Sequence, residues 1–498
     1  MSINALILGL VLASPPQTPA PVAEVATAPG LSYSSAQERL RTASPATRAA
    51  HYGLEAAENQ RSATEGLYRP TVSLDVQMLR YRKTLNLALG DVYDQAQGGI
   101  SAAIPGLIGG VAGDLPGISP DVLGQVEQRL QAVLPEIFSG LPQDVRLRTE
   151  RSVFRPAVTA IQPIYTGGAI PALRRAAGAN ADLAEARLQE AVDLESVNLA
   201  RTYFGQVLAT EAVQIARDTR DGFDLHLRNA QRMQDEGLLS RGQVLQVEVA
   251  RDTAQRLLNS AEVDLINATA ALSSLLDMDH AVAPTTALFV NRESVGPADV
   301  FLTGADQSNS KLAQAQAGRE LAQAGADLAA SRMRPVVYAF GSYNMNPDGA
   351  TPTEPDWAFG IGARYTLIST VDRRKMASSA RAQAMAANEV ERQARDQIKL
   401  LVTRAYNQAE LARRQFLSMD SSLASASENL RVQEIGFREG ETTASAVIDA
   451  RNLLGTARLQ RAAAAYEYNL SLAALLAASG SDQSLTDYQQ RPDRISTP

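Results

Sequence analysis

The sequence predicts an α+β protein in which two long antiparallel α-helical hairpins are combined with four β-strands. Two proline-free stretches, about 172–234 and 374–436, are rich in Ala, Gln, Glu and Arg and carry apolar residues at spacings of four and seven. This periodicity is typical of helices that pack against other helices. At 1.5 Å per residue, about 60 residues make a rod of roughly 90 Å, which is too long for a compact globule.

An internal two-fold sequence repeat is the second observation behind this fold class. Each rod is followed by a turn and a second helix, about 243–276 and 446–478. One constant offset relates the halves over about 70 residues, and it pairs Tyr203 with Tyr406, Gly237 with Gly440 and Leu272 with Leu475. Because two unrelated alanine-rich hairpins would not keep their turn glycines in register, we expect the two halves to be copies.

Two strand-like segments before each rod are the third observation. In 71–78 and 357–366, apolar residues alternate with polar or small ones, whereas 153–165 and 336–344 alternate less regularly. Alternation with period two suits a strand that has one lipid-facing side and one water-facing side. A soluble sheet that covers a core gives the same pattern, so the strands alone leave both interpretations open.

The N-terminus has the features of a secretory signal peptide. Residues 5–13 form an apolar run, and a Pro- and Ala-rich stretch follows, with Ala20 and Ala23 as candidate cleavage positions. The run is shorter than the ~20 residues of a membrane-spanning helix and fits the apolar part of a signal peptide. Residues 1–4 contain no Lys or Arg, so an apolar, disordered start is the alternative.

Two segments have no counterpart in the repeat, an insertion at 83–150 and a linker at 281–309. The expected organisation is a signal peptide (1–23), an N-terminal helix (31–66), a first strand pair (67–165) that contains the insertion, a first helical hairpin (166–280), the equatorial linker (281–309), a helix (310–332), a second strand pair (333–367), a second helical hairpin (368–478) and a C-terminal tail (479–498). The insertion is far longer than the turn that a hairpin needs.

Composition excludes several classes of function. The chain has 498 residues, a net charge of −7, three histidines and no cysteine. Without cysteine there is no disulfide framework, thiolate metal site or cysteine nucleophile, and the acidity argues against nucleic-acid binding. The glycine-rich run at 106–113 lacks the Lys-Ser/Thr of a phosphate-binding loop. We therefore expect no enzymatic activity, no cofactor, no metal site and no nucleic-acid partner.

Short motifs stand at the boundaries of these elements. They are Ser44-Pro45 in the first helix, Tyr68-Arg69-Pro70 and Met333-Arg334-Pro335 before the first and third strands, Pro163 to Gly168 after the second strand, and Gly237 and Gly440 at the two helix-tip turns. In this order and spacing, over about 35–478, they resemble the TolC-like family of outer-membrane efflux and secretion channels. That family usually has Asn-Pro where this chain has Ser44-Pro45.

The resemblance implies a homotrimer in the bacterial outer membrane. Three protomers would contribute four strands each to one 12-stranded outer-membrane β-barrel, continued by an α-barrel tunnel through the periplasm. The implied partners are outer-membrane lipid, a periplasmic adaptor (membrane fusion) protein and an inner-membrane transporter, either ABC-type or proton-driven. The expected function is a passive exit duct for type I protein secretion, small-molecule efflux or both. The alternative is a periplasmic coiled-coil adaptor or scaffold without a pore.

The resemblance also implies a gate at the periplasmic tips, where helices of the second hairpin close around rings of aspartates. Carried over by register, the tip aromatic is Phe437, its partner position is Gln243, the arginine position is Thr442, and the ring positions are Ala446 and Asp449. Only Asp449 has the residue type of the family, and three copies of it would form an anionic constriction. A solvated helical aspartate is the alternative for that residue.

Because Phe437 has no hydroxyl group to donate, we expect latches that differ from those of the family, with Arg241, Arg438 and Glu439 as candidates. The tips are also where the adaptor would dock. The expected docking residues are Gly237, Arg241, Gly440, Arg438 and Glu439. The insertion at 83–150 would lie on the extracellular side, where we expect it to cover the barrel mouth or contact another surface component.

Overall fold

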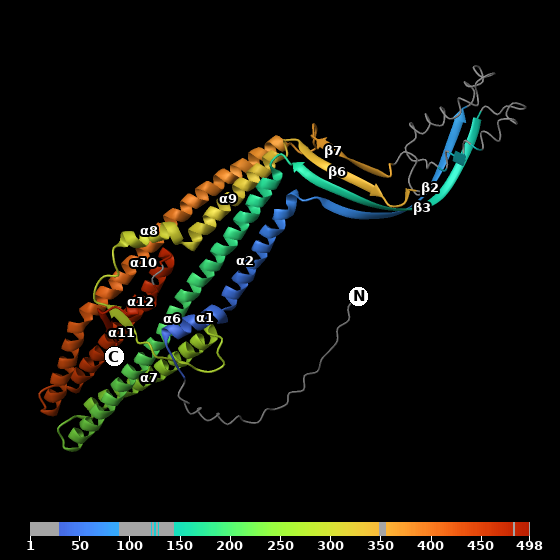
Figure 1. The fold of residues 1–498 in the computed structure, drawn as a ribbon. Coiled ribbons are helices and arrows are strands. Elements are labelled where there is room, and N and C mark those ends of the chain that lie inside the picture. Colours follow the sequence, from blue (N-terminus) through green and yellow to red (C-terminus); the bar gives the residue numbers. More distant parts are fainter. Residues whose placement is uncertain are drawn as a thin grey trace, which may run out of the picture. The chain divides into compact units, whose positions relative to one another are not determined.

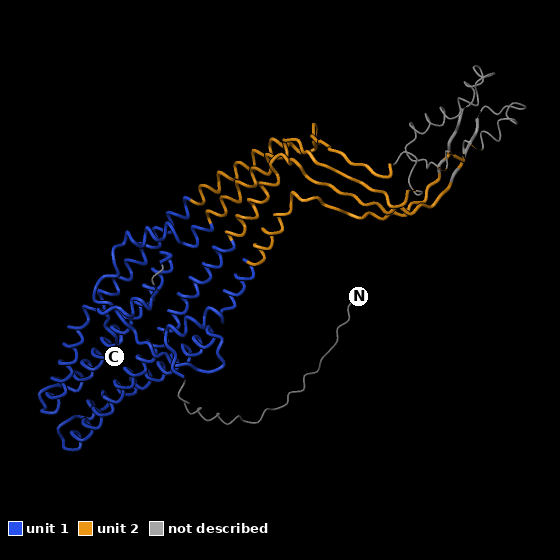
Figure 2. The backbone as a smooth tube through the Cα atoms, viewed as in Figure 1, with its two compact units in different colours: residues 1–54, 184–314, 392–498 blue, residues 55–183, 315–391 orange. Residues whose placement is uncertain are grey.

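The computed structural model describes residues 29–88, 121, 124–125, 128, 144–347, 355–481 and 484–497. The expected signal peptide and most of the expected insertion, with its glycine-rich run, lie outside these residues. Figure 2 shows that the chain divides into two compact units. Unit 1 comprises 1–54, 184–314 and 392–498, and unit 2 comprises 55–183 and 315–391.

The four long helices lie where the apolar periodicity predicts them (Figure 1). The first hairpin consists of α6 (Ala169–Asp235) and α7 (Arg241–Leu275), and the second of α10 (Arg373–Arg438) and α11 (Ala444–Ser479). Alanine has the highest helix propensity, and its small side chain lets neighbouring helices approach closely. None of the helices within the described residues is both long and apolar enough to cross a membrane.

The expected N-terminal helix is interrupted. It consists of α1 (Tyr33–Ala43) and α2 (Pro45–Ala63), followed by the 3₁₀ helix η1 (Thr64–Tyr68). Ser44 separates the two α-helices, and its hydroxyl oxygen accepts a hydrogen bond from the Thr47 backbone N–H at 3.2 Å. Proline cannot continue a helix but fits its first position, so the Ser-Pro pair ends one helix and starts the next.

Unit 2 contains a four-stranded antiparallel sheet in the order β2-β3-β6-β7. Its strands are β2 (Thr71–Ala88), β3 (Asp144–Tyr165), β6 (Val336–Asn344) and β7 (Trp357–Arg364). The first two strands are longer than the sequence predicted, because both continue into the expected insertion. The segment between them is therefore 89–143 rather than 83–150.

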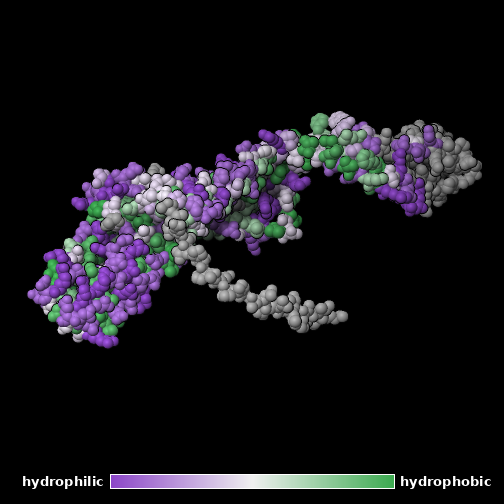
Figure 3. All heavy atoms as spheres, turned by 90° about the horizontal axis from the view of Figure 1, so that it is seen from below, coloured by the Kyte–Doolittle hydropathy of each residue, from purple (hydrophilic) through white to green (hydrophobic). Residues whose placement is uncertain are grey.

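One face of the sheet is apolar and exposed. It includes Met78 on β2, Phe154 on β3 and Phe359 and Ile361 on β7, with Met78 82% and Phe359 79% exposed. Figure 3 shows hydrophobic residues gathered over the described strands. Burying such a face against another apolar phase is favourable by about 25 cal/mol per Å². The described part of this chain supplies no layer that covers it.

The expected equatorial linker carries secondary structure of its own. It contains β4 (Ala283–Pro284), β5 (Phe289–Asn291) and α8 (Ala298–Ser308), and α9 (Ser310–Ser331) follows. The remaining short elements are β1 (Gly30–Leu31), α12 (Leu485–Gln489) and β8 (Arg494–Ser496). β1 pairs with β4, and β5 pairs with β8, so both ends of the described chain join the linker.

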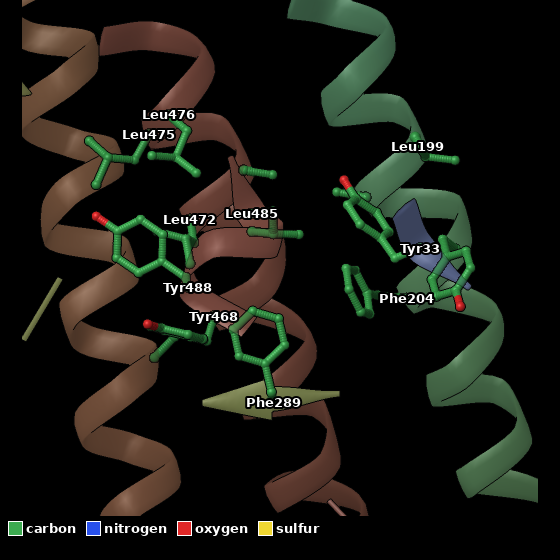
Figure 4. Close-up of a cluster of buried hydrophobic side chains, with 14 of the residues drawn as sticks. Tyr33, Leu199, Phe204, Phe289, Tyr468, Leu472, Leu475, Leu476, Leu485 and Tyr488 are labelled. Atoms are coloured by element: carbon green, nitrogen blue, oxygen red, sulfur yellow. The ribbon is translucent and has the colours of Figure 1, made fainter. Parts of the chain in front are cut away.

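Aromatic side chains form the core of unit 1 beside this linker (Figure 4). Phe204 of α6 is fully buried, stacks on Tyr33 at a centroid distance of 5.1 Å and meets Phe289 of β5 edge to face at 6.3 Å. The Tyr203 hydroxyl donates to the Leu31 carbonyl oxygen at 2.6 Å. These contacts attach α1 and β5 to the rod α6.

Polar side chains of α11 form hydrogen bonds with β5. The Asn469 side-chain amide donates to the Phe289 carbonyl oxygen at 2.6 Å and accepts from the Phe289 N–H at 3.3 Å. The Tyr468 hydroxyl donates to Asn291 at 2.9 Å. Since all of these groups are buried, each hydrogen bond satisfies a polar atom that water does not reach.

Candidate functional site at the hairpin tips

The two tip turns are built alike. α6 ends before Gly237 and α10 before Gly440, with φ angles of +80° and +76°. In each turn, the N–H of the residue after the glycine donates to a carbonyl five residues back: Leu238 to Met233 and Glu441 to Gly436, both at 2.7 Å. This left-handed helix ending favours glycine, which explains why the two turns carry it. The internal repeat of the sequence nevertheless stays a prediction.

Gln243 and Thr442 are engaged in local backbone structure. Ser240 caps α7, and the Gln243 side chain accepts from the Ser240 backbone N–H at 3.1 Å, which completes a capping box. The Thr442 hydroxyl donates to the Gln433 carbonyl oxygen at 3.2 Å. Both side chains therefore stabilise the turns. The structure pairs neither of them with Phe437.

Phe437 belongs to a small apolar core below the tips that joins the two hairpins. This core contains Ala230 of α6, Val244 and Val247 of α7, Ala426, Leu430 and Phe437 of α10, and Ala444, Val447, Ala450 and Leu454 of α11. The Phe437 ring meets the imidazole of His226 edge to face, with centroids 4.6 Å apart. An apolar contact thus replaces the hydrogen bond that a hydroxyl group would make here.

His226 is a buried, neutral imidazole between the hairpins. Its Nε2 atom has no hydrogen-bond partner among the described residues. Burial lowers the pKa of His226 from its ordinary 6.5 to about 4; a hydrogen bond with the Ala444 backbone opposes the shift, and the charge of Arg451 adds to it. A proton on this ring would bring a second positive charge next to a buried guanidinium.

Arg451 of α11 bridges three helices. Its guanidinium forms an ion pair with Glu434 of α10 and lies 5.7 Å from the ring centroid of Phe223 on α6. The Arg451 side chain is only 13% exposed, and burial lowers its pKa while Glu434 opposes that shift. A Cβ atom at Gly222 would lie 1.6 Å from Nη1 of Arg451. The absence of a side chain at Gly222 therefore lets the guanidinium lie on the α6 backbone.

The other predicted residues lie on the exposed surface of the tips. Asp449, Arg241 and Glu439 are exposed, and their side chains make no hydrogen bond or ion pair with the described residues. Arg438 is exposed and donates to the Glu434 carbonyl oxygen of its own helix at 3.3 Å. None of the three candidate latches therefore ties one hairpin to the other in the described part of the chain. That part also holds no group of three or more His, Asp and Glu side chains arranged for a metal ion.

Comparison with known proteins assigns this fold. Residues 302–481 match the family model described as outer membrane efflux protein. The match covers about a third of the chain and shows a likeness to this family over that segment. The resemblance to TolC-like channels that the sequence motifs indicated is thereby confirmed, together with the localisation in the bacterial outer membrane.

Solved channels share the fold of this chain over about nine-tenths of its length. The CmeC outer membrane channel of Campylobacter jejuni superposes with a TM-score of 0.68 at 12% identity, covering 92% of this chain and 88% of that chain. The open state of the MtrE outer membrane channel of Neisseria gonorrhoeae gives a TM-score of 0.65 at 15% identity, covering 90% and 89%. CusC superposes with a TM-score of 0.69 at 14% identity, covering 90% of this chain and 92% of that chain. No curated protein sequence matches the chain.

The sequence analysis did not identify Arg451, Gly222 or His226 as residues of the tips. Aligning the chain with the family identifies only the positions where the family has functional residues. Position 451 is not among them. A usable signal was present, because Gly222 is an unexpected residue inside a long helix. Glycine costs about 1 kcal/mol relative to alanine in a helix interior, which indicates close approach of another group.

Low pH is expected to destabilise the tips because His226 becomes protonated. The folded protein binds the proton with a pKa of about 4 and the unfolded chain with 6.5. The stability that neutral His226 contributes is therefore fully present above pH 6.5 and is lost as the pH falls from 6.5 to 4. We expect the thermal midpoint of the purified protein to fall between pH 7 and pH 5, and to fall less in His226→Phe.

The matched control for this measurement is His280→Phe, since His280 is exposed. It removes an imidazole from an exposed site and should leave the pH dependence of the thermal midpoint as it is in the wild type. An equal fall in wild type and His226→Phe would show that other groups cause the acid effect.

Proposed function

We propose that this protein is an outer-membrane efflux channel and the passive exit duct of a tripartite export system. Three copies form one channel, in which the sheets cross the outer membrane as a 12-stranded barrel and the helical hairpins form a periplasmic tunnel. An adaptor protein docks at the tips, and an inner-membrane transporter, ABC-type or proton-driven, supplies the energy. The chain itself catalyses no reaction.

The unpaired edges of the four-stranded sheet carry this proposal. β2 and β7 each have one hydrogen-bonded neighbour in the sheet, so each presents a row of free backbone N–H and C=O groups. An apolar surrounding cannot satisfy such groups, and a sheet in a membrane must close on itself. Four strands are too few to close a barrel, whose smallest members have about eight. Pairing of β7 with β2 of the next copy satisfies both edges.

Cysteine cross-linking tests this closure directly, because the chain has no cysteine of its own. Pairs of cysteines are introduced with one on β2, at Val72, Leu74 or Val76, and one on β7, at Phe359 or Ile361. We expect oxidation of the membrane-inserted protein to yield covalent trimers for at least one pair. The control carries both cysteines on β2. Cross-linked species of any other size, or none for all pairs, would overturn the trimer.

Small-molecule efflux is the cargo class that we favour, because the family description names efflux. A deletion strain should become more susceptible to toxic small molecules, and wild-type protein expressed in trans should restore resistance. Loss of one or a few large proteins from the growth medium, with unchanged susceptibility, would instead assign type I secretion. A non-pore adaptor would give no ion conductance in planar bilayers.

Within this duct, we assign the selectivity of the tip to Asp449. Three exposed copies, one per protomer, would form an anionic ring that favours cations. Asp449→Asn is expected to lower the cation-to-anion permeability ratio several-fold, measured from reversal potentials in a salt gradient. Glu248→Gln removes an exposed carboxylate from α7 and serves as the control. An unchanged ratio in the Asp449 variant would remove the ring.

A further inference from the structure

The apolar face of β2 changes abruptly into a basic one. Side chains on a strand alternate between two faces, so Val72, Leu74, Val76 and Met78 share a face with Arg80 and Arg82. The four apolar residues are exposed, and so is the Arg80 side chain, at 75%. The change takes place within two residues, about 7 Å along the strand.

Beyond this change the sheet narrows to two strands. The pairing of β6 with β3 ends at Ala157, whereas β2 and β3 stay paired as far as Ala88 and Asp144. The basic residues thus lie on a two-stranded ribbon that extends past β6 and β7, as Figure 1 shows. Figure 3 shows the hydrophobic surface of the strands giving way to a hydrophilic one along this direction.

The ribbon carries more positive than negative charge on this face. Arg80 and Arg82 both bind the carboxylate of Glu150, each at 3.0 Å. Arg148 is exposed on the same face of β3, two residues from Glu150, and has no ion-pair partner among the described residues. Among the described side chains on this face, three guanidinium groups are therefore balanced by one carboxylate, which pairs with two of them, in a chain whose net charge is −7. The resulting surplus of positive charge faces solvent.

We propose that Arg80, Arg82 and Arg148 form a docking surface for the phosphate-bearing headgroups of the outer membrane's external leaflet. This inference rests on the proposed function, which places the sheet in the membrane. A lipid has an anionic headgroup joined to apolar chains, and the ribbon presents guanidinium groups joined to an apolar stripe on the same face. Guanidinium groups bind phosphate through two parallel hydrogen bonds. The headgroup binds the arginines while the acyl chains lie along Val72 to Met78.

The test measures lipid retention by the purified full-length trimer. The protein is incubated with phosphatidylglycerol or phosphatidylcholine, and the lipids that remain bound are counted by native mass spectrometry. We expect the wild type to retain at least fivefold more of the anionic lipid. In Arg80→Gln/Arg148→Gln this preference should disappear. In Arg151→Gln/Arg155→Gln, which removes the same charge from the other face of the ribbon, it should remain.

Glu150→Gln provides a measurement in the opposite direction. Removing this carboxylate releases two arginines, so we expect anionic lipid to bind about threefold more tightly. If the arginines served only to hold the ribbon together through Glu150, the same change would weaken or abolish binding. Stronger binding in Glu150→Gln therefore supports the lipid surface, and weaker binding overturns it.

Three outcomes would overturn the inference while leaving the duct intact. They are equal retention of the two lipids by a trimer that inserts and conducts, equal loss of preference in both double arginine variants, and full competition by inorganic phosphate at the same concentration as the lipid. The last outcome would show a site for a free anion. Failure of the wild type to form trimers that conduct would instead overturn the proposed function.

Discussion

Replacing Arg451 by alanine is expected to raise the open probability of the proposed trimeric duct more than tenfold at neutral pH. Arg451 ties α11 to α10 through Glu434 and lies on Phe223 of α6. A hydrogen bond to a charged group contributes about 1.5–3 kcal/mol, and a cation–π contact about 0.5–1 kcal/mol. If these contacts hold the hairpins of the proposed duct in a closed arrangement, losing roughly 2 kcal/mol changes the open population by more than a factor of ten. Single-channel recording in planar bilayers measures the effect.

Two further variants distinguish the contacts of Arg451 from the mere loss of a positive charge. Gly222→Ala keeps Arg451, but its methyl group occupies the position of the guanidinium, so a smaller rise in open probability is expected. Arg458→Ala removes an exposed ion pair with Asp218 at 3.5 Å, which contributes at most about 1 kcal/mol. It should conduct like the wild type. Equal open probability in all four proteins would show that the tips are held elsewhere.

Replacing Phe204 by alanine is expected to reduce the free energy of unfolding by about 3–5 kcal/mol. The ring is fully buried between Tyr33, Tyr203 and Phe289, and its removal leaves a cavity where α1, α6 and β5 meet. Thermal unfolding followed by circular dichroism should show the lower midpoint. Phe204→Leu retains much of the volume and should cost less.

Tyr52→Ala is the matched control for this loss. Tyr52 lies on α2 and is 66% exposed, so removing its ring should change stability by no more than about 0.5 kcal/mol. If Phe204→Ala were as stable as this control, the aromatic cluster would not be the core of unit 1.

The helices were the most predictable part of the fold because their signal is long and repeated. A rod such as 172–234 offers many turns of consistent periodicity, and the observed helix, Ala169–Asp235, differs by only a few residues at its ends. Glycines 237 and 440 were predicted at the turns for the same reason, since their backbone conformation excludes most other residues. The sequence predicts helices and turns well because their conformation depends mainly on residues that are close together in the chain.

The extent of the strands and the contacts between hairpins were not predictable in this way. β2 continues to Ala88 because β3 provides a partner over its whole length, and pairing between distant segments leaves no local pattern. The position of Arg451 depends on Gly222, which is far away in the sequence and on another helix. Register with the family led instead to Gln243 and Thr442, whose side chains serve their own turns.

The pairing of β5 with β8 has a consequence for biogenesis. Phe289 precedes the second hairpin, whereas its strand partner Ser496 follows that hairpin, about 200 residues further along the chain. The first hairpin is therefore complete long before the segment beside it acquires its partner, and the contact closes a very large loop. Until β8 pairs with β5, the backbone edge of β5 lacks this partner. Completion of this part of unit 1 therefore waits for residues that follow the second hairpin.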